Sequence, residues 1–165
     1  GVFSRPRDKK VEETYGSGAV IGFAVIDSLD DLTADVIENA PAIGNLFGQG
    51  EWGGCNQCYL LKDGRIGVIG HKCYAEKDAD GVKQAVYLNG VAFLFDPETH
   101  QATEPQVIAT RRSYPDAAAK LPKLKDCAFT SGIVLREDGK ADLYSGLGDT
   151  HEGRVTIDNP FGDLL

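Results

Sequence analysis

Two stretches of this sequence have the pattern of a tight β-hairpin, and this pattern constrains the fold more than any other feature. Asp63 and Gly64 separate one pair of apolar segments, and Asp138 and Gly139 separate another. An Asp-Gly pair between apolar segments readily supplies the positive-φ turn that a hairpin needs. Repeated hairpins of this kind predict an all-β protein.

Other apolar segments are rich in β-branched and aromatic side chains, which predicts further strands. These segments are residues 19–26, 36–37, 85–95, 106–109 and 154–157. Residues 27–33 are expected to form a turn or a single helical turn, and residues 115–120 favour one helical turn. Residues 44–54 are rich in Gly, which predicts a loop that brings the backbone close to another group.

The strand hairpins recur at a spacing longer than one propeller blade. This arrangement favours a β-propeller with long loops, in which each blade is a small antiparallel sheet. A β-sandwich is the alternative that the hairpins alone leave open. We therefore expect residues 1–165 to form a single β-propeller segment.

The composition limits the partners and the compartment of the protein. The sequence has 17 Lys and Arg against 25 Asp and Glu, a formal net charge of −8. Such a chain repels the phosphates of nucleic acids and anionic lipids, so we expect neither nucleic acid nor a membrane as a partner. No apolar run approaches the roughly 20 residues of a membrane helix. Four Cys are too few for a disulfide scaffold, which predicts a soluble, cytoplasmic protein.

Four segments carry a resemblance to a known family. They are residues 3–6, which end in Arg-Pro, residues 69–72, which contain a His, residues 87–96, and residues 129–150, which end in Gly-Leu-Gly-Asp-Thr. In their order, these segments resemble five-bladed β-propeller glycosidases, above all the mannoside phosphorylase and mannosidase family (glycoside hydrolase family 130) and its uncharacterised MTP-1-like relative. The likeness covers nearly all of this chain but only about the C-terminal half of such a propeller. It therefore implies that the chain, which begins with Gly rather than Met, is a fragment of a longer propeller.

The resemblance implies a glycosidase-like propeller that acts on an oligosaccharide, which in this family is a mannoside. An Asp of an early blade is the family's general acid, so the catalytic acid is expected outside this chain. Arg5 and His71 match phosphate-binding positions, and Asp149 matches an Asp that hydrogen-bonds sugar hydroxyls. The structural alternatives for these three residues are a surface charge, a buried structural histidine and a turn residue, respectively.

One departure from the family pattern bears on the reaction. Near the position of a phosphate-binding Lys in the family, this chain has Glu51. A carboxylate there would repel phosphate, so hydrolysis is favoured over phosphorolysis. The second Tyr of the terminal motif is replaced by Ser145. No cofactor is expected.

Three further residues are candidates for sugar binding. Trp52 could stack on the apolar face of a sugar ring, and Asn56 and Gln57 could hydrogen-bond its hydroxyls. The structural alternatives are a core position for Trp52 and hydrogen bonds to loop backbone for the two carboxamides.

The cysteines support a different hypothesis. Cys55, Cys58, His71 and Cys73 are four potential zinc ligands at a plausible spacing. Cys55 and Cys58, however, would lie on opposite faces of a regular strand, which favours buried free thiols. A zinc-stabilised interaction module therefore stays an alternative, as does a non-catalytic carbohydrate-binding or scaffold propeller.

A partial propeller also predicts particular partners. It leaves open strand edges and an exposed apolar flank, which promote association. We expect a carbohydrate ligand, together with either the N-terminal half of the propeller or a partner that covers the open edge.

Overall fold

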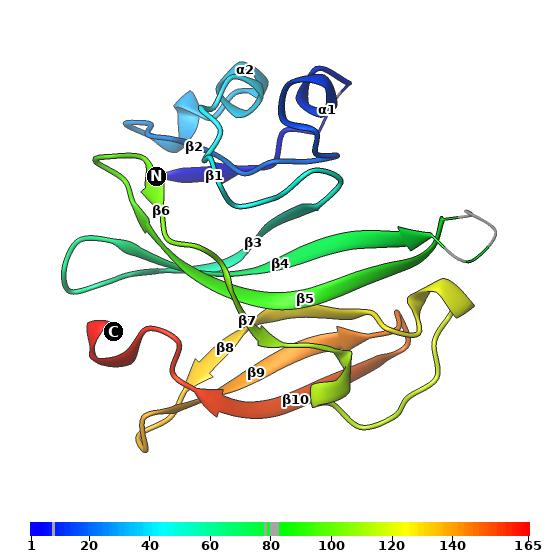
Figure 1. The fold of residues 1–165 in the computed structure, drawn as a ribbon. Coiled ribbons are helices and arrows are strands. Elements are labelled where there is room, and N and C mark those ends of the chain that lie inside the picture. The colour runs from blue at the N-terminus through cyan, green and yellow to red at the C-terminus, as the bar shows by residue number, and fades with distance from the viewer. Residues whose placement is uncertain (8, 78, 80–82) are drawn as a thin grey trace.

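The computed structural model describes residues 1–7, 9–77, 79 and 83–165, and these residues form three antiparallel sheets (Figure 1). The first sheet pairs β1 (Val2–Ser4) with β2 (Gly22–Ala24). The second contains β3 (Trp52–Leu60), β4 (Ile66–Lys77), β5 (Lys83–Asp96) and β6 (Gln101–Ala102) in that order, with β7 (Gln106–Ala109) paired to β5. The third contains β8 (Ala128–Leu135), β9 (Lys140–Leu147) and β10 (His151–Asp158), with β9 in the middle. The fold is all-β, as predicted.

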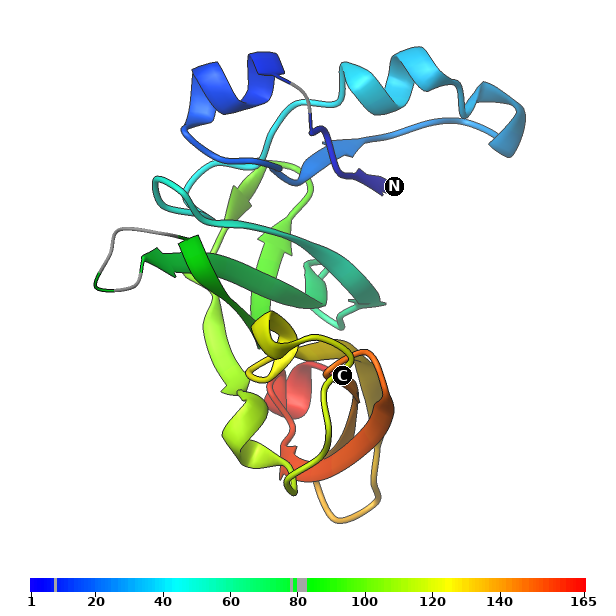
Figure 2. The same ribbon diagram turned by 90° about the vertical axis from the view of Figure 1, so that its right-hand side faces the viewer.

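The three sheets are stacked, with the β3–β5 sheet between the other two (Figure 2). Hydrophobic clusters fill both spaces: Val68 of β4 packs with Phe23 on one side, and Ile69 packs with Leu143 on the other. Because successive side chains of a strand point to opposite faces, the central sheet is buried on both faces. Stacking of this kind is typical of neighbouring blades in a propeller.

The helices are short. They are α1 (Lys9–Tyr15) and α2 (Ala34–Glu38), which lie beside the β1–β2 sheet (Figure 1), and the 3-10 helices η1 (Leu29–Asp31), η2 (Arg111–Ser113), η3 (Pro122–Leu124) and η4 (Gly162–Leu164). In the part of the chain that the structure describes, no helix has the length and apolar character needed to cross a lipid bilayer.

Three local predictions need correction. The strand expected at residues 36–37 is part of α2, because Thr33 caps this helix and its Oγ1 accepts a hydrogen bond from Val36 N at 3.3 Å. The strand expected over residues 19–26 is shorter and consists of β2 alone. Residues 115–120 are not helical, and the 3-10 helices η2 and η3 lie on either side of them.

Both Asp-Gly hairpins are confirmed. Gly64 and Gly139 have φ angles of 86° and 77°, values that favour glycine. Asp63 Oδ1 and Asp138 Oδ1 each accept a hydrogen bond from the backbone N–H two residues later, at 3.1 Å and 3.2 Å. The local sequence therefore determines both turns.

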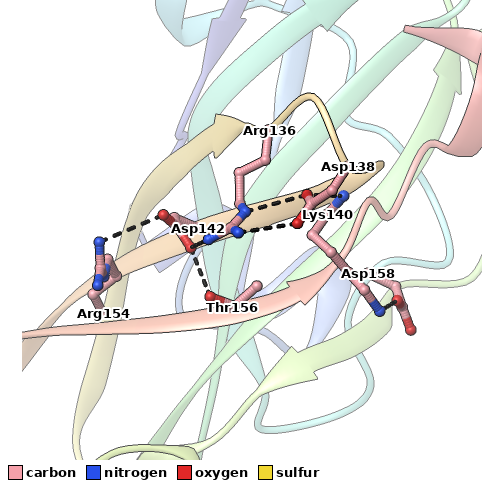
Figure 3. A network of polar contacts seen from close by, with 7 residues as sticks. All are labelled: Arg136, Asp138, Lys140, Asp142, Arg154, Thr156 and Asp158. Carbon is pink, nitrogen blue, oxygen red and sulfur yellow. Dashed lines mark hydrogen bonds and ion pairs between the residues drawn. The ribbon is translucent and has the colours of Figure 1, made fainter.

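A network of charged groups connects the second hairpin to β10 (Figure 3). Asp142 of β9 accepts a hydrogen bond from Thr156 Oγ1 of β10 at 2.7 Å. Arg136 and Arg154 lie 3.5 Å and 3.6 Å from its carboxylate, and Arg136 also pairs with Asp138 in the turn at 2.9 Å. The hydrogen bond from Thr156 and the two guanidinium groups lower the pKa of Asp142 below its ordinary value.

Candidate functional site

Three side chains from distant parts of the sequence meet where the sheets come together. Arg5 follows β1, His71 lies in β4 and Phe129 lies in β8. Arg5 Nε donates a hydrogen bond to Gly53 O of β3 at 2.8 Å. The ring centroids of His71 and Phe129 are 4.6 Å apart. The site thus receives groups from all three sheets.

Two glycines of β3 allow Arg5 and His71 to approach each other. Gly54 lies opposite His71 in the sheet, and a Cβ atom there would lie 3.1 Å from His71 Cε1 and 3.2 Å from Arg5 Cδ. A Cβ atom on Gly53 would lie 2.2 Å from His71 O. The glycine-rich segment therefore brings the backbone close to other groups, as predicted. These two glycines do so from within a strand rather than from a loop.

His71 is buried in its neutral form. Its Nδ1 lies 2.7 Å from Asn56 Oδ1, and Nδ1 carries the proton because a carboxamide oxygen can only accept. Burial, and then the positive charge of Arg5, lowers the pKa of His71 to about 4. Its Nε2 is therefore an acceptor, suited to a hydroxyl group. The residue lies within β4, five residues from its first residue.

Phe129 is the functional candidate that sequence reasoning missed. Its side chain is 41% exposed, although its ring packs against the buried imidazole of His71. An exposed aromatic ring beside polar groups can stack on the apolar face of a sugar. The sequence offered only a weak signal, because an aromatic residue in an alternating strand is usually assigned to packing.

A β-bulge in β3 sets the directions of the neighbouring polar side chains. Cys55 pairs with Gly70 and Gln57 pairs with Ile69, so Asn56 is the extra residue. Asn56 reaches His71 through the bulge. Gln57 Oε1 instead accepts a hydrogen bond from the backbone N–H of Ile133 at 2.7 Å, which joins β3 to β8.

A cleft of about 380 Å³ lies beside Arg5. Its lining contains Arg5, Arg7, Gly18, Ala19 and Trp52. The two guanidinium groups give this cleft a positive charge in a protein whose net charge is −8. The cleft therefore suits an anionic group, which Arg side chains bind through paired hydrogen bonds.

Glu51 lies close to this cleft but does not stand as an isolated negative charge. Lys72 Nζ lies 2.7 Å from Glu51 Oε2, and Gly48 N donates a hydrogen bond to the same oxygen at 2.6 Å. Burial raises the pKa of Glu51, yet the contacts with Lys72 and Gly48 outweigh it and hold this pKa below its ordinary value. The carboxylate is thus ionised and neutralised by its partner.

Asp149 lies in the turn after β9, where Gly148 and Asp149 have φ angles of 58° and 59°. Thr150 Oγ1 donates a hydrogen bond to Ala118 O at 2.6 Å and fixes this turn. Burial, and then the charge of Asp149, raises the pKa of the Cys127 thiol to about 11. Asp149 is exposed and lies near Cys127.

The four zinc candidates do not come together. Among the described residues, no group of three or more His, Cys, Asp or Glu side chains could hold a metal ion. His71 and Cys73 share one face of β4 with Ile69, whereas Cys55 packs toward the opposite cluster. The expectation that Cys55 and Cys58 lie on opposite faces is also wrong, because the bulge brings them to the same face.

Comparisons with known proteins extend these observations. A model of a family of proteins of unknown function, DUF1861, matches residues 1–163. MPT-4, a mannose phosphorylase from Leishmania mexicana solved in complex with a phosphate ion, is 43% identical, with a TM-score of 0.84 over 96% of this chain. MPT-1, a GDP-Man-dependent mannosyltransferase from Leishmania mexicana, is 46% identical, with a TM-score of 0.81 over 88% of this chain. A hypothetical protein from Leishmania major is 44% identical, with a TM-score of 0.77 over 94% of this chain.

The chain spans about half the length of these solved structures: 47%, 48% and 46% of them, respectively. No curated protein matches the chain. The antiparallel sheets of the chain therefore correspond to part of a larger, propeller-like domain.

Proposed function

The chain belongs to the DUF1861 family of proteins of unknown function, and we propose that it supplies the phosphate- and sugar-binding part of an enzyme that acts on mannosides. In the proposed reaction, phosphate attacks the anomeric carbon of a mannosyl residue and the glycosidic bond breaks. A general acid from another part of a five-bladed propeller protonates the departing oxygen. The products are mannose 1-phosphate and a shortened oligosaccharide. The likeness to a mannose phosphorylase and a mannosyltransferase supports this assignment.

The observation that carries the proposal is the approach of Arg5, which lines the positively charged cleft, to a neutral His71. Arg5 and Arg7 bind the phosphate, because guanidinium groups match the geometry of an oxyanion. His71 Nε2 accepts a hydrogen bond from a sugar hydroxyl or from a protonated phosphate oxygen. The positive charge of Arg5 and the neutral acceptor of His71 thus lie side by side. Such a pair suits a phosphate group bound next to a sugar hydroxyl.

The sugar lies against Phe129 in this proposal. An aromatic ring that is partly exposed offers an apolar face to the C–H groups of a mannosyl ring. Trp52 forms the other aromatic wall, beside Arg5. Asp149, which lies near Cys127, is assigned to hydroxyl groups of the oligosaccharide.

The ion pair of Glu51 favours phosphorolysis over the hydrolysis that the sequence suggested. A carboxylate near the site would by itself repel phosphate. Lys72 lies 2.7 Å from this carboxylate and compensates its charge. With that charge compensated, the two arginines of the cleft dominate the electrostatic field that a phosphate meets.

The proposal predicts phosphate-dependent release of mannose 1-phosphate when the chain, combined with the part of the propeller that supplies the general acid, is incubated with manno-oligosaccharides of defined linkage. Phosphorus NMR follows this product. Arg5→Ala should lower kcat/KM for phosphate by ~100-fold, the loss expected for a charge-assisted contact with an anion.

Arg112→Ala is the matched control, because Arg112 is an exposed arginine of η2 outside the cleft. This variant should retain the activity. Release of free mannose in place of mannose 1-phosphate would establish hydrolysis instead. Saturable sugar binding without any turnover would identify a carbohydrate-binding propeller.

A further inference from the structure

The bulge in β3 brings two thiols of one strand to the same side of the sheet. Cys55 pairs with Gly70 and Cys58 pairs with Val68, and both partners lie two residues apart on β4. Paired residues of antiparallel strands point to the same face, and residues two apart on a strand share a face. Cys55 and Cys58 therefore point to the same face, toward the cluster that contains Val68.

The same register brings the two Cα atoms close together. Three residues of a regular strand would separate them by ~10 Å, but their partners on β4 are only two residues and ~6.6 Å apart. Disulfides are found at Cα separations up to ~6.8 Å. The bulge thus shortens this part of β3 to a length that a disulfide bond can span.

Both thiols can also be reached from outside. Cys55 and Cys58 line one open cavity of about 440 Å³, together with Phe3 and Ile66. Cys58 is exposed and Cys55 is half-buried, whereas Cys73 and Cys127 are buried. A hydrogen bond between the first two thiols lowers the pKa of Cys58, and this bond and burial raise the pKa of Cys55. Cys58 is therefore the thiol that is more readily deprotonated.

We propose that Cys55 and Cys58 form a reversible dithiol–disulfide pair that reacts with low-molecular-weight disulfides. The Cys58 thiolate attacks the disulfide of the small molecule, forms a mixed disulfide and releases one thiol. Cys55 then loses its proton, attacks Cys58 Sγ and displaces the second thiol. One small disulfide and two protein thiols thus yield one protein disulfide and two small thiols.

The position of this pair connects it to the candidate site. Asn56 and Gln57 lie between the two cysteines. Asn56 is hydrogen-bonded to His71, and Gln57 is hydrogen-bonded to the backbone of Ile133. A disulfide across these residues fixes the bulge that directs Asn56 toward His71. Oxidation therefore changes the surroundings of His71 without a direct contact between the disulfide and the imidazole.

Differential alkylation in graded glutathione buffers tests the pair on the intact protein. Trypsin cleaves after Lys10 and Lys62, so peptide 11–62 contains both cysteines and no other. After oxidation, the mass of this peptide should be lower by two hydrogens, and its two cysteines should resist alkylation. The peptides that carry Cys73 and Cys127 should be alkylated fully once the protein is unfolded.

Single variants assign the order of attack. Cys55→Ser should trap one glutathione on Cys58, and Cys58→Ser should slow the modification of Cys55 by at least ~10-fold, because the more readily ionised thiol is absent. Glutathione adducts on the native protein without loss of two hydrogens from peptide 11–62 would overturn the proposal. So would equal reactivity of the two single variants.

A second measurement tests the connection with the site and does not depend on activity. Oxidation should shift the imidazole NMR signals of His71 and leave those of His151 on β10 unchanged. Unchanged signals of His71 in a fully oxidised protein would contradict the connection, whereas the disulfide itself would still stand.

Discussion

At the scale of single residues, His71 concentrates the chemistry of the candidate site. The side chain is only 5% exposed, and its Nδ1 proton is held by Asn56. With the pKa of His71 lowered to about 4, the imidazole is neutral near pH 7. Positive charge beside it therefore comes from Arg5, and the imidazole contributes a hydrogen-bond acceptor.

The burial of a neutral imidazole predicts a pH dependence of stability. Between pH 6.5 and about 4 the unfolded chain binds a proton at His71 and the folded chain does not. Stability from this residue is therefore present above pH 6.5 and is lost as the pH falls toward 4. Between these limits the free energy of unfolding should fall by ~2 kcal/mol more in the native protein than in His71→Gln, after allowance for solvent screening.

Denaturant unfolding at a series of pH values measures this difference. His151→Gln is the control, because His151 is exposed on β10, and its curve should follow that of the native protein. Parallel curves for the native protein and His71→Gln would show that the folded state does not disfavour the charged imidazole.

At the scale of elements, the third sheet depends on charges as well as on its core. Asp142 connects β9 to β10 through Thr156 and lies near two arginines, as Figure 3 shows. Lys140 and Asp158 form a second ion pair between the same strands, but this pair is solvent-exposed. Exposed pairs contribute little to stability, whereas a hydrogen-bonded carboxylate with several partners contributes more.

Substitution of the central carboxylate should therefore destabilise the third sheet. Asp142→Asn removes the charge that faces Arg136 and Arg154 and should lower the midpoint of thermal unfolding by ~3 °C, a typical shift for one destabilising substitution in a protein of this size. Calorimetry at low salt measures this midpoint. Asp158→Asn should leave the midpoint of thermal unfolding nearly unchanged. Equal shifts for Asp142→Asn and Asp158→Asn would contradict the expectation that Asp142 contributes more to stability than the exposed ion pair.

The elements also show which structural features could be predicted from the sequence. Both hairpins were predicted, because the positive φ angles of Gly64 and Gly139 are a local requirement. The pair Val36-Ile37 favours a strand by its side chains, but it lies in α2 because the cap at Thr33 outweighs the strand preference of two β-branched residues. The bulge at Asn56 was not predicted, since it depends on the pairing of β3 with β4.

At the scale of the whole molecule, the stacked sheets leave several apolar side chains at the surface. Val25, Leu29 and Leu60 are 71%, 84% and 79% exposed. The solved structures that the chain matches are about twice as long as the region they share with it. These two observations support the prediction that another part of a propeller, or a partner, covers this chain.

Light scattering after size-exclusion chromatography tests that prediction on the 165-residue chain. We expect the chain to associate with itself or with the unmatched part of MPT-4 when the two are produced together, because burial of exposed apolar surface favours association. Leu60→Ser should weaken this association. A chain that stays monomeric alone and in the mixture would contradict the prediction.

The all-β class and the two hairpin turns could be predicted from the sequence alone, and a family resemblance made Arg5, His71 and Asp149 candidates. Hairpin turns depend on the φ angles of neighbouring residues, and the motifs are short, so both can be recognised from adjacent positions. Three other features became visible in the three-dimensional structure: Arg5 approaches His71 past Gly54, Phe129 packs against His71, and Cys55 and Cys58 share a face. These features depend on pairing and packing between residues far apart in the chain, where one bulge changes the direction of every following side chain.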